Sequence, residues 1–301
     1  MKKIPLHIGK QALAALQVLL ICLGTSCHSP NTYNWWDEED SNTNVEAITV
    51  TIMENDSTQS QLSAGSQLGY CVFSNDGTSS TTNTPITVGA EGVISLPSPV
   101  RGSYVIYSPY QSEWEYIFST PLLFKVKKDQ STEANYNDSN FTLGTIDIVP
   151  SDNSGNNRSI AMKQMMSKLY IRIIDETGYI DFKEEGSLKL LNMKDAVTLN
   201  LPDPKVSTVD SSAEDISMYI NERTDRRLTA VAIIAPQARG EGTPFLEFKV
   251  KGRQYVYKQS FTLDSGQSYA YIFRLTGNGL QLDGAFITNW EIGEKDTTLP
   301  I

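Results

Sequence analysis

The sequence predicts an all-β protein built from β-sandwich domains, and three observations support this fold class. Short runs of alternating apolar and polar residues, rich in β-branched and aromatic types, recur along the chain from residue 45 onward. Turn-forming Gly, Pro, Asn, Asp and Ser separate these runs. No long segment shows the period of about 3.6 residues that marks an amphipathic helix. Many short strands joined by turns are typical of antiparallel sandwiches.

The first predicted strand shows the pattern most simply, because Ile48, Val50 and Ile52 alternate with threonines. Two short helical segments are also expected. Ser211 has Glu214 three residues later, which is the spacing of a helix capping box, and residues 163–166 favour one further helical turn. The same strand alternation recurs at residues 104–107, 169–173, 246–250 and 269–275.

The alternating segments divide into two groups around a polar stretch at residues 151–157, which reads Ser-Asp-Asn-Ser-Gly-Asn-Asn. Such a composition is typical of a linker. The sequence therefore predicts an N-terminal sandwich at residues 45–150 and a C-terminal sandwich at residues 158–301. Each segment has a suitable length for one domain.

Residues 1–26 have the features of a bacterial lipoprotein signal peptide. Three lysines open the segment, an apolar run follows at residues 12–23, and small residues precede Cys27. The run is shorter than the roughly 20 residues that span a bilayer, so it predicts a removable export signal. We expect lipid, including palmitate, on Cys27, so that the exported protein is held on a membrane by its lipid. An ordinary secretory signal cut nearby is the alternative.

Residues 27–44 are predicted to form a disordered tether, because polar residues and an acidic run at residues 37–40 leave little to bury. Trp35 and Trp36 stand out within it. They either pack loosely on the neighbouring domain or contact membrane or a partner.

Charge, cysteine and histidine counts exclude several functions. The chain has 25 Lys and Arg against 35 Asp and Glu, a net charge of −10, which argues against a nucleic-acid partner. Once Cys22 and Cys27 are assigned to the signal and the lipid, Cys71 has no partner for an intrachain disulfide and is expected to be a buried strand residue. With 2 histidines in the chain, neither a histidine triad nor a histidine metal site is expected, and no cofactor is predicted.

No residue pattern predicts an enzyme. Paired carboxylates such as Glu184 and Glu185 fit solvated turns, and no phosphate-binding loop, dinucleotide fingerprint or calcium loop is present. Trp114 and Tyr116 either form a platform for a glycan or fill the core of a strand.

Several motifs, in this order, resemble the fimbrillin-like family of Bacteroidetes type V pilus subunits and surface lipoproteins. The resemblance covers nearly all of the chain after the signal peptide. The motifs are Tyr104-Val-Ile-Tyr-Ser-Pro-Tyr110, Met162 to Ile173, Ala232-Ile-Ile-Ala-Pro-Gln237, Phe248 to Tyr255, Leu263-Asp-Ser-Gly-Gln-Ser-Tyr269 and Ile287-Thr-Asn-Trp290.

The resemblance implies two transthyretin-like Greek-key β-sandwiches and assembly into a fimbrium for cell adhesion. It also implies a surface-exposed protein, anchored to the cell outer membrane through its lipid. In such assembly a protease removes the first strand, and the terminal strand of another pilus subunit fills the groove. Here it implies Ile48, Val50 and Ile52 as the groove fillers of the first strand. It implies Trp290 and Ile292 as anchors of the donor strand.

One departure from the family concerns processing, which in well-known members follows a basic residue near the first strand. This chain has no Lys or Arg between Cys27 and Arg101. Either a protease of other specificity acts, or the chain stays untrimmed as an anchor or accessory subunit of the pilus. A non-polymerising surface lipoprotein that binds a glycan or a host protein is the alternative function.

Overall fold

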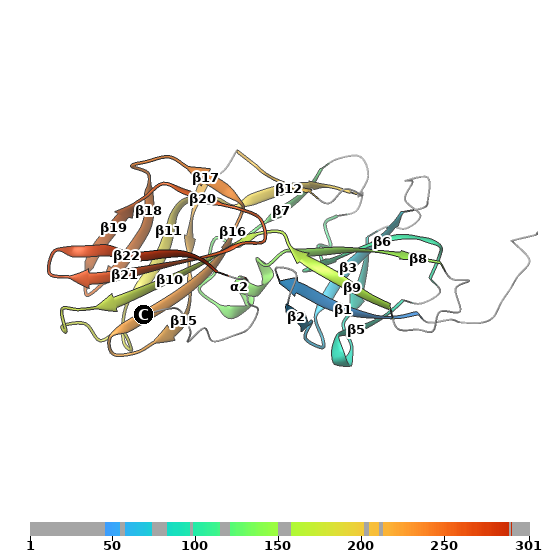
Figure 1. Cartoon of the computed structure of the whole chain (residues 1–301), viewed down its shortest axis with the longest axis horizontal. Coiled ribbons are helices and arrows are strands. Elements are labelled where there is room, and N and C mark those ends of the chain that lie inside the picture. Colours follow the sequence, from blue (N-terminus) through green and yellow to red (C-terminus); the bar gives the residue numbers. More distant parts are fainter. Residues whose placement is uncertain are drawn as a thin grey trace, which may run out of the picture. The chain divides into compact units, whose positions relative to one another are not determined.

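The computed structural model describes residues 46–54, 58–73, 83–96, 99–114, 121–149, 158–201, 205–210, 213–288 and 290. These residues form an all-β fold, as the alternation predicted (Figure 1). One short α-helix, α2 (Glu133–Asp138), and one 3-10 turn, η1 (Ala90–Gly92), are present among them. No helix in these ranges is long and apolar enough to span a membrane.

The largest sheet has eight strands in the order β2-β1-β9-β8-β6-β3-β4, and β5 also pairs with β1. The only parallel pair within this sheet, as far as the structure describes it, joins β1 to β9. Its strands are β1 (Glu46–Glu54), β2 (Thr58–Gln61), β3 (Gln67–Phe73), β4 (Thr84–Thr87), β5 (Val93–Leu96), β6 (Gly102–Ser108), β8 (Thr142–Ile148) and β9 (Arg158–Gln164).

Two further sheets contain most of the later strands. The five-stranded sheet has the order β15-β16-β10-β21-β22, and the four-stranded sheet has the order β14-β11-β18-β19. The strands are β10 (Ser167–Asp175), β11 (Ser187–Lys194), β14 (Ala213–Ser217), β15 (Tyr219–Arg223), β16 (Arg227–Ile234), β18 (Pro244–Val250), β19 (Arg253–Lys258), β21 (Ser268–Thr276) and β22 (Gly279–Thr288).

Two smaller sheets complete the described fold. One has the order β13-β12-β7 and the other pairs β17 with β20. Their strands are β7 (Leu122–Lys125), β12 (Ala196–Asn200), β13 (Lys205–Thr208), β17 (Gln237–Arg239) and β20 (Phe261–Leu263).

In two of the sheets, strands that precede the predicted linker pair with strands that follow it. β9, which follows residues 151–157, pairs with β1 and β8, whereas β7, which precedes them, pairs with β12. Residues 151–157 themselves lie outside the described ranges. The predicted division into two domains at this point stays a prediction.

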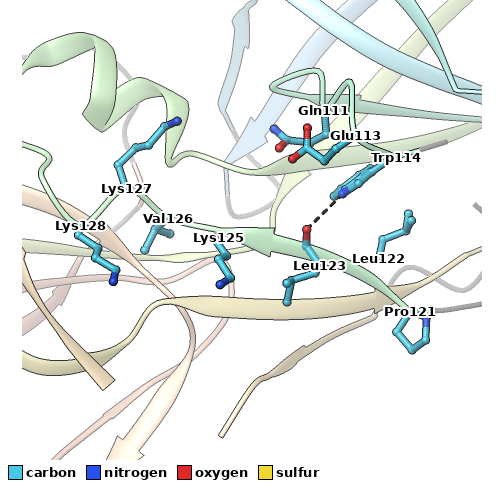
Figure 2. Close-up of a pocket in the computed structure, with 10 residues that line it drawn as sticks. All are labelled: Gln111, Glu113, Trp114, Pro121, Leu122, Leu123, Lys125, Val126, Lys127 and Lys128. Carbon is cyan, nitrogen blue, oxygen red and sulfur yellow. Dashed lines mark hydrogen bonds between the residues drawn. The ribbon is translucent and has the colours of Figure 1, made fainter. Parts of the chain in front are cut away.

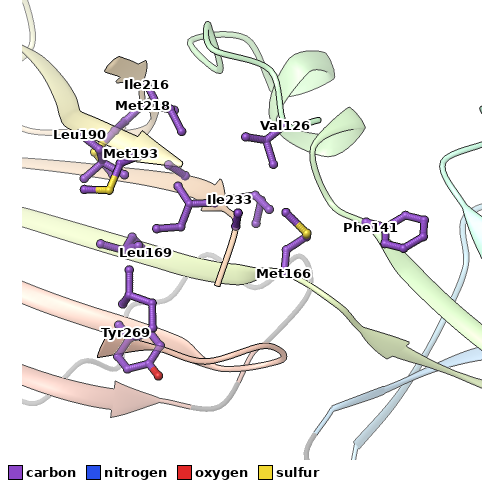
Figure 3. Close-up of a cluster of buried hydrophobic side chains, with 14 of the residues drawn as sticks. Val126, Phe141, Met166, Leu169, Leu190, Met193, Ile216, Met218, Ile233 and Tyr269 are labelled. Atoms are coloured by element: carbon purple, nitrogen blue, oxygen red, sulfur yellow. The ribbon is translucent and has the colours of Figure 1, made fainter. Parts of the chain in front are cut away.

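Two main clusters of buried apolar side chains stabilise the sheets. The smaller cluster includes Leu68, Ile106 and Ile160, all from the eight-stranded sheet. The larger cluster combines side chains from before and after the predicted linker, among them Phe141 and Met166. Figure 3 shows Met166 on the segment between β9 and β10, with Phe141 on one side and the side chains of β10 and β11 on the other. Each fully buried side chain of this size contributes about 1.5–3 kcal/mol.

Both predicted helical segments are wrong. The first becomes β14 and β15, because Ile216 alternates with polar neighbours and pairs with Leu190 of β11. The second, at residues 163–166, contains the end of β9 and the two residues before β10. Tertiary pairing therefore outweighs the local capping pattern at these sites.

Candidate assembly site at the first strand

β1 is an interior strand of its sheet, although it comes first among the described strands. β9 pairs with one edge of β1 in parallel over residues Ile48–Met53. β5 and β2 share the other edge, with β5 opposite Glu46–Thr49 and β2 opposite Thr51–Glu54. Figure 1 shows β1 between these strands, beside β9 from much later in the sequence.

The register places the three predicted groove fillers opposite buried residues of the neighbouring strands. Ile48 pairs with Ile94 of β5. Val50 pairs with Ile160 of β9, and Ile52 pairs with Met162 of the same strand. Ile94, Ile160 and Met162 are at most 1% exposed and belong to the core cluster of this sheet.

Sequence reasoning did not foresee the role of β9. Residues 158–164 were predicted to open the second domain, yet they supply the long parallel neighbour of β1. The signal that would have indicated this role is the alternation of Ile160, Met162 and Gln164, which are all buried. Alternation predicts a strand but does not indicate which strand it pairs with.

The loop that contains Arg101 is held at its start by a tyrosine. The Tyr104 hydroxyl donates a hydrogen bond to the Val100 carbonyl at 3.0 Å and accepts one from the Val100 N–H at 2.9 Å. Tyr104 is 2% exposed, whereas Arg101 is exposed. Arg101, the first basic residue after Cys27, therefore lies in an accessible loop whose backbone is fixed on one side.

The structure describes two of the other residues singled out from the sequence, Trp114 and Trp290. Trp290 is 1% exposed and belongs to the larger core cluster. Ile292 and Cys27 lie outside the described residues, as does Tyr116. Trp114 is 5% exposed and packs against Tyr107 and Phe141, so it fills a core as one of its two predicted roles required.

The described residues carry no arrangement that points to metal or thiol chemistry. No group of three or more His, Cys, Asp or Glu side chains among them is suited to hold a metal ion. Cys71 is free and buried, as predicted, and its Sγ lies 3.9 Å from the Val105 carbonyl oxygen. Burial raises the pKa of the Cys71 thiol to about 12, so the reactive thiolate is disfavoured at neutral pH.

The sequence matches the model of the fimbrillin-like family over residues 39–290. The chain belongs to the fimbrillin-like family. No curated protein matches the chain.

Solved structures share the fold of this fimbrillin-like chain. A candidate cell adhesion protein from Bacteroides ovatus aligns with a TM-score of 0.66 at 15% identity, over 82% of this chain and 98% of the other. A second such protein, from Bacteroides uniformis, aligns with a TM-score of 0.62 at 18% identity, over 83% of this chain and 99% of the other. The tip fimbrial protein Mfa3 from Porphyromonas gingivalis aligns with a TM-score of 0.52 at 9% identity, over 82% and 100%.

Proposed function

We propose that the protein is a structural or accessory subunit of a cell-surface fimbria and joins other pilus subunits by strand exchange at β1. The position of β1 carries this proposal. Because β1 pairs on both edges, its removal opens a slot flanked by β9 on one side and by β5 and β2 on the other. A terminal strand from another subunit regains the same backbone hydrogen bonds by β-augmentation.

Side-chain recognition in this slot follows from the register. The partners of Ile48, Val50 and Ile52 are buried, so a donor strand that fills the slot needs apolar residues at alternate positions. Trp290 and Ile292 are proposed as the corresponding anchors when this chain donates its own terminal segment. Such head-to-tail contacts between subunits do not close on themselves and therefore produce a filament.

The N-terminus determines the position of the subunit in the fimbria. We propose that Cys27 carries the lipid that attaches the newly exported chain to the outer membrane. If the chain instead stays untrimmed, it keeps β1 and contributes only its own terminal strand, as an anchor or accessory subunit, and the absence of basic residues from His28 to Val100 supports this version. The Tyr104 contacts also support this position, since they fix the backbone beside Arg101, the first basic residue.

Mass spectrometry of the N-terminus in fibres sheared from native cells tests the proposal. An N-terminus beyond Glu54, the last residue of β1, is the result expected for a stalk subunit. A lipidated Cys27 as the sole N-terminus, in chains that co-purify with other pilus subunits, identifies an anchor or accessory subunit. If the chain is absent from sheared fibres and does not co-purify with pilus subunits, it is a non-polymerising surface lipoprotein. Binding to a glycan or host-protein panel, measured as a shift in Tm, is then the relevant assay.

A further inference from the structure

Within the part of the chain that the structure describes, β7 has one unpaired edge. It pairs with β12 and ends the order β13-β12-β7. The Val126 N–H donates to the Asp195 carbonyl at 2.9 Å, so the backbone of Val126 faces β12. Because backbone direction alternates along a strand, the N–H and C=O groups of Leu123 and Lys125 point away from β12.

Two side chains bound this edge. The Trp114 indole Nε1 donates to the Leu123 carbonyl at 3.1 Å, and the Ser139 hydroxyl accepts from the Lys127 N–H at 2.9 Å. Between these two contacts, no described residue bonds to the outward N–H of Leu123 or to the outward N–H and C=O of Lys125. These are the groups that an added strand uses for pairing.

The unpaired edge borders an open groove of ≈740 Å³. Figure 2 shows β7 and the segment that follows it on one side of the groove, with Gln111, Glu113 and Trp114 on the other. Leu123 adds an apolar contact at this edge, since it is 43% exposed. The groove is therefore an accessible strip of backbone beside an apolar side chain.

The groove carries positive charge in a chain whose net charge is −10. Among the described residues, Lys125, Lys127 and Lys128 line it against one acidic residue, Glu113. Lys128 forms an ion pair with Glu214 at 2.5 Å. Lys125 and Lys127 are exposed and form no ion pair within the described part of the chain, so their charges are available to a ligand.

We propose that this groove binds an extended acidic peptide of a partner protein, which adds a short strand to β7 beside Leu123 and Lys125. Backbone hydrogen bonds to the unpaired edge supply affinity. Lys125 and Lys127 select acidic side chains on the peptide. This site is separate from the strand exchange proposed at β1, because no residue of β7 pairs with β1 or its neighbours.

Isothermal titration calorimetry of the full chain with synthetic peptides tests the proposal. The probe is Thr-Glu-Val-Glu-Val-Glu-Thr, and its matched control replaces each Glu with Lys. We expect the acidic peptide to bind at least about tenfold more tightly than the lysine peptide. N-methylation of the backbone at the central Glu and at both valines removes donors on both edges of the peptide, so it should weaken binding about tenfold whichever edge pairs with β7.

Variants of the chain separate the groove from general charge effects. The double substitution Lys125→Glu and Lys127→Glu should weaken acidic-peptide binding about tenfold. Lys183→Glu with Lys258→Glu makes the same charge change at exposed positions away from the groove and should change affinity less than about twofold. Circular dichroism checks that each variant folds.

Three results would overturn the proposal. Equal affinity for the acidic and lysine peptides contradicts selection by the lysines. Undiminished binding of the N-methylated peptide contradicts strand addition. Absence of binding by the unmodified acidic peptide at up to about 1 mM excludes this class of ligand from the groove.

Discussion

The side-chain amide of Gln130 forms two hydrogen bonds with the backbone of Ile233, as a paired residue of a neighbouring strand would. The Gln130 Nε2 donates to the Ile233 carbonyl at 2.7 Å, and the Ile233 N–H donates to Gln130 Oε1 at 2.9 Å. Both residues are fully buried. The amide therefore satisfies two backbone groups of β16 that would otherwise be buried without partners.

Replacing Gln130 with Ala should lower the free energy of unfolding by about 2–4 kcal/mol, because it leaves the buried Ile233 peptide unsatisfied. Urea denaturation followed by circular dichroism measures the loss. Gln281→Ala on the exposed face of β22 is the matched control and should change stability by less than about 0.5 kcal/mol. Equal effects of the two substitutions would contradict a structural role for the Gln130 pair.

Gly69 should not tolerate a side chain, because the Tyr107 ring occupies the space above it. The two residues pair across β3 and β6, and a Cβ on Gly69 would lie 2.2 Å from the Tyr107 ring carbon Cζ. Gly69→Ala should therefore destabilise the fold by about 1–3 kcal/mol. Gly240→Ala, where no atom lies within 4 Å of the added Cβ, should be close to neutral in the same thermal unfolding measurement.

The strands could be predicted from the sequence, but their neighbours could not. Alternation around Ile171 and Tyr271 predicts β10 and β21 because each residue's face depends only on local spacing. Their parallel pairing, with Ile171 opposite Tyr271, depends on chain segments 100 residues apart. Alternation carries no information about that choice.

The one described α-helix had a recognisable start that the sequence reasoning did not use. The Thr132 hydroxyl accepts a hydrogen bond from the Asn135 N–H at 3.3 Å, with Glu133 in the first turn. The predicted cap at Ser211 and Glu214 had an equally good local pattern, yet its residues from Ala213 onward form a strand. The local capping patterns alone therefore did not distinguish the segment that forms a helix from the segment that forms a strand.

Tyr104→Phe should make the chain more susceptible to cleavage after Arg101. The substitution removes the hydroxyl that fixes both backbone groups of Val100. Proteases bind an extended, adaptable segment, so loosening this loop should increase the initial rate of tryptic cleavage at Arg101 about tenfold. Limited trypsin digestion with mass spectrometry measures that rate. Cleavage after the exposed Arg226, far along the chain, serves as the internal control and should not change.

Cys71 should be unreactive in the folded protein and should weaken the fold at alkaline pH. Burial raises the pKa of its thiol from 9.0 to about 12. Because the folded pKa lies above the unfolded value, the stabilising contribution is complete below pH 9 and is lost as the pH rises towards 12. We expect slow labelling by a thiol reagent at pH 8, becoming fast in denaturant.

The Cys71→Ala variant isolates this effect. Its free energy of unfolding should decline less steeply between pH 9 and 12 than that of the unmodified chain. It should also lose about 1 kcal/mol at neutral pH, because the smaller side chain leaves a cavity. Identical alkaline profiles for the two proteins would show that the Cys71 thiol is not the group responsible.

A disulfide between β1 and β9 tests strand exchange at β1 most directly. Thr49 and Ser159 are register partners on β1 and β9. Neighbouring strands lie about 4.8 Å apart, so Thr49→Cys with Ser159→Cys brings two cysteines close enough for a disulfide. Thr198→Cys with Ser207→Cys on β12 and β13 forms a matched bond away from β1. The measurement is the ladder of subunits on mildly denaturing gels of surface fibres, before and after reduction.

Strand exchange predicts that the β1–β9 bond abolishes the ladder, that reduction restores it, and that the β12–β13 bond has no effect. A full ladder from chains in which the β1–β9 bond is verified by mass spectrometry would contradict strand exchange at β1.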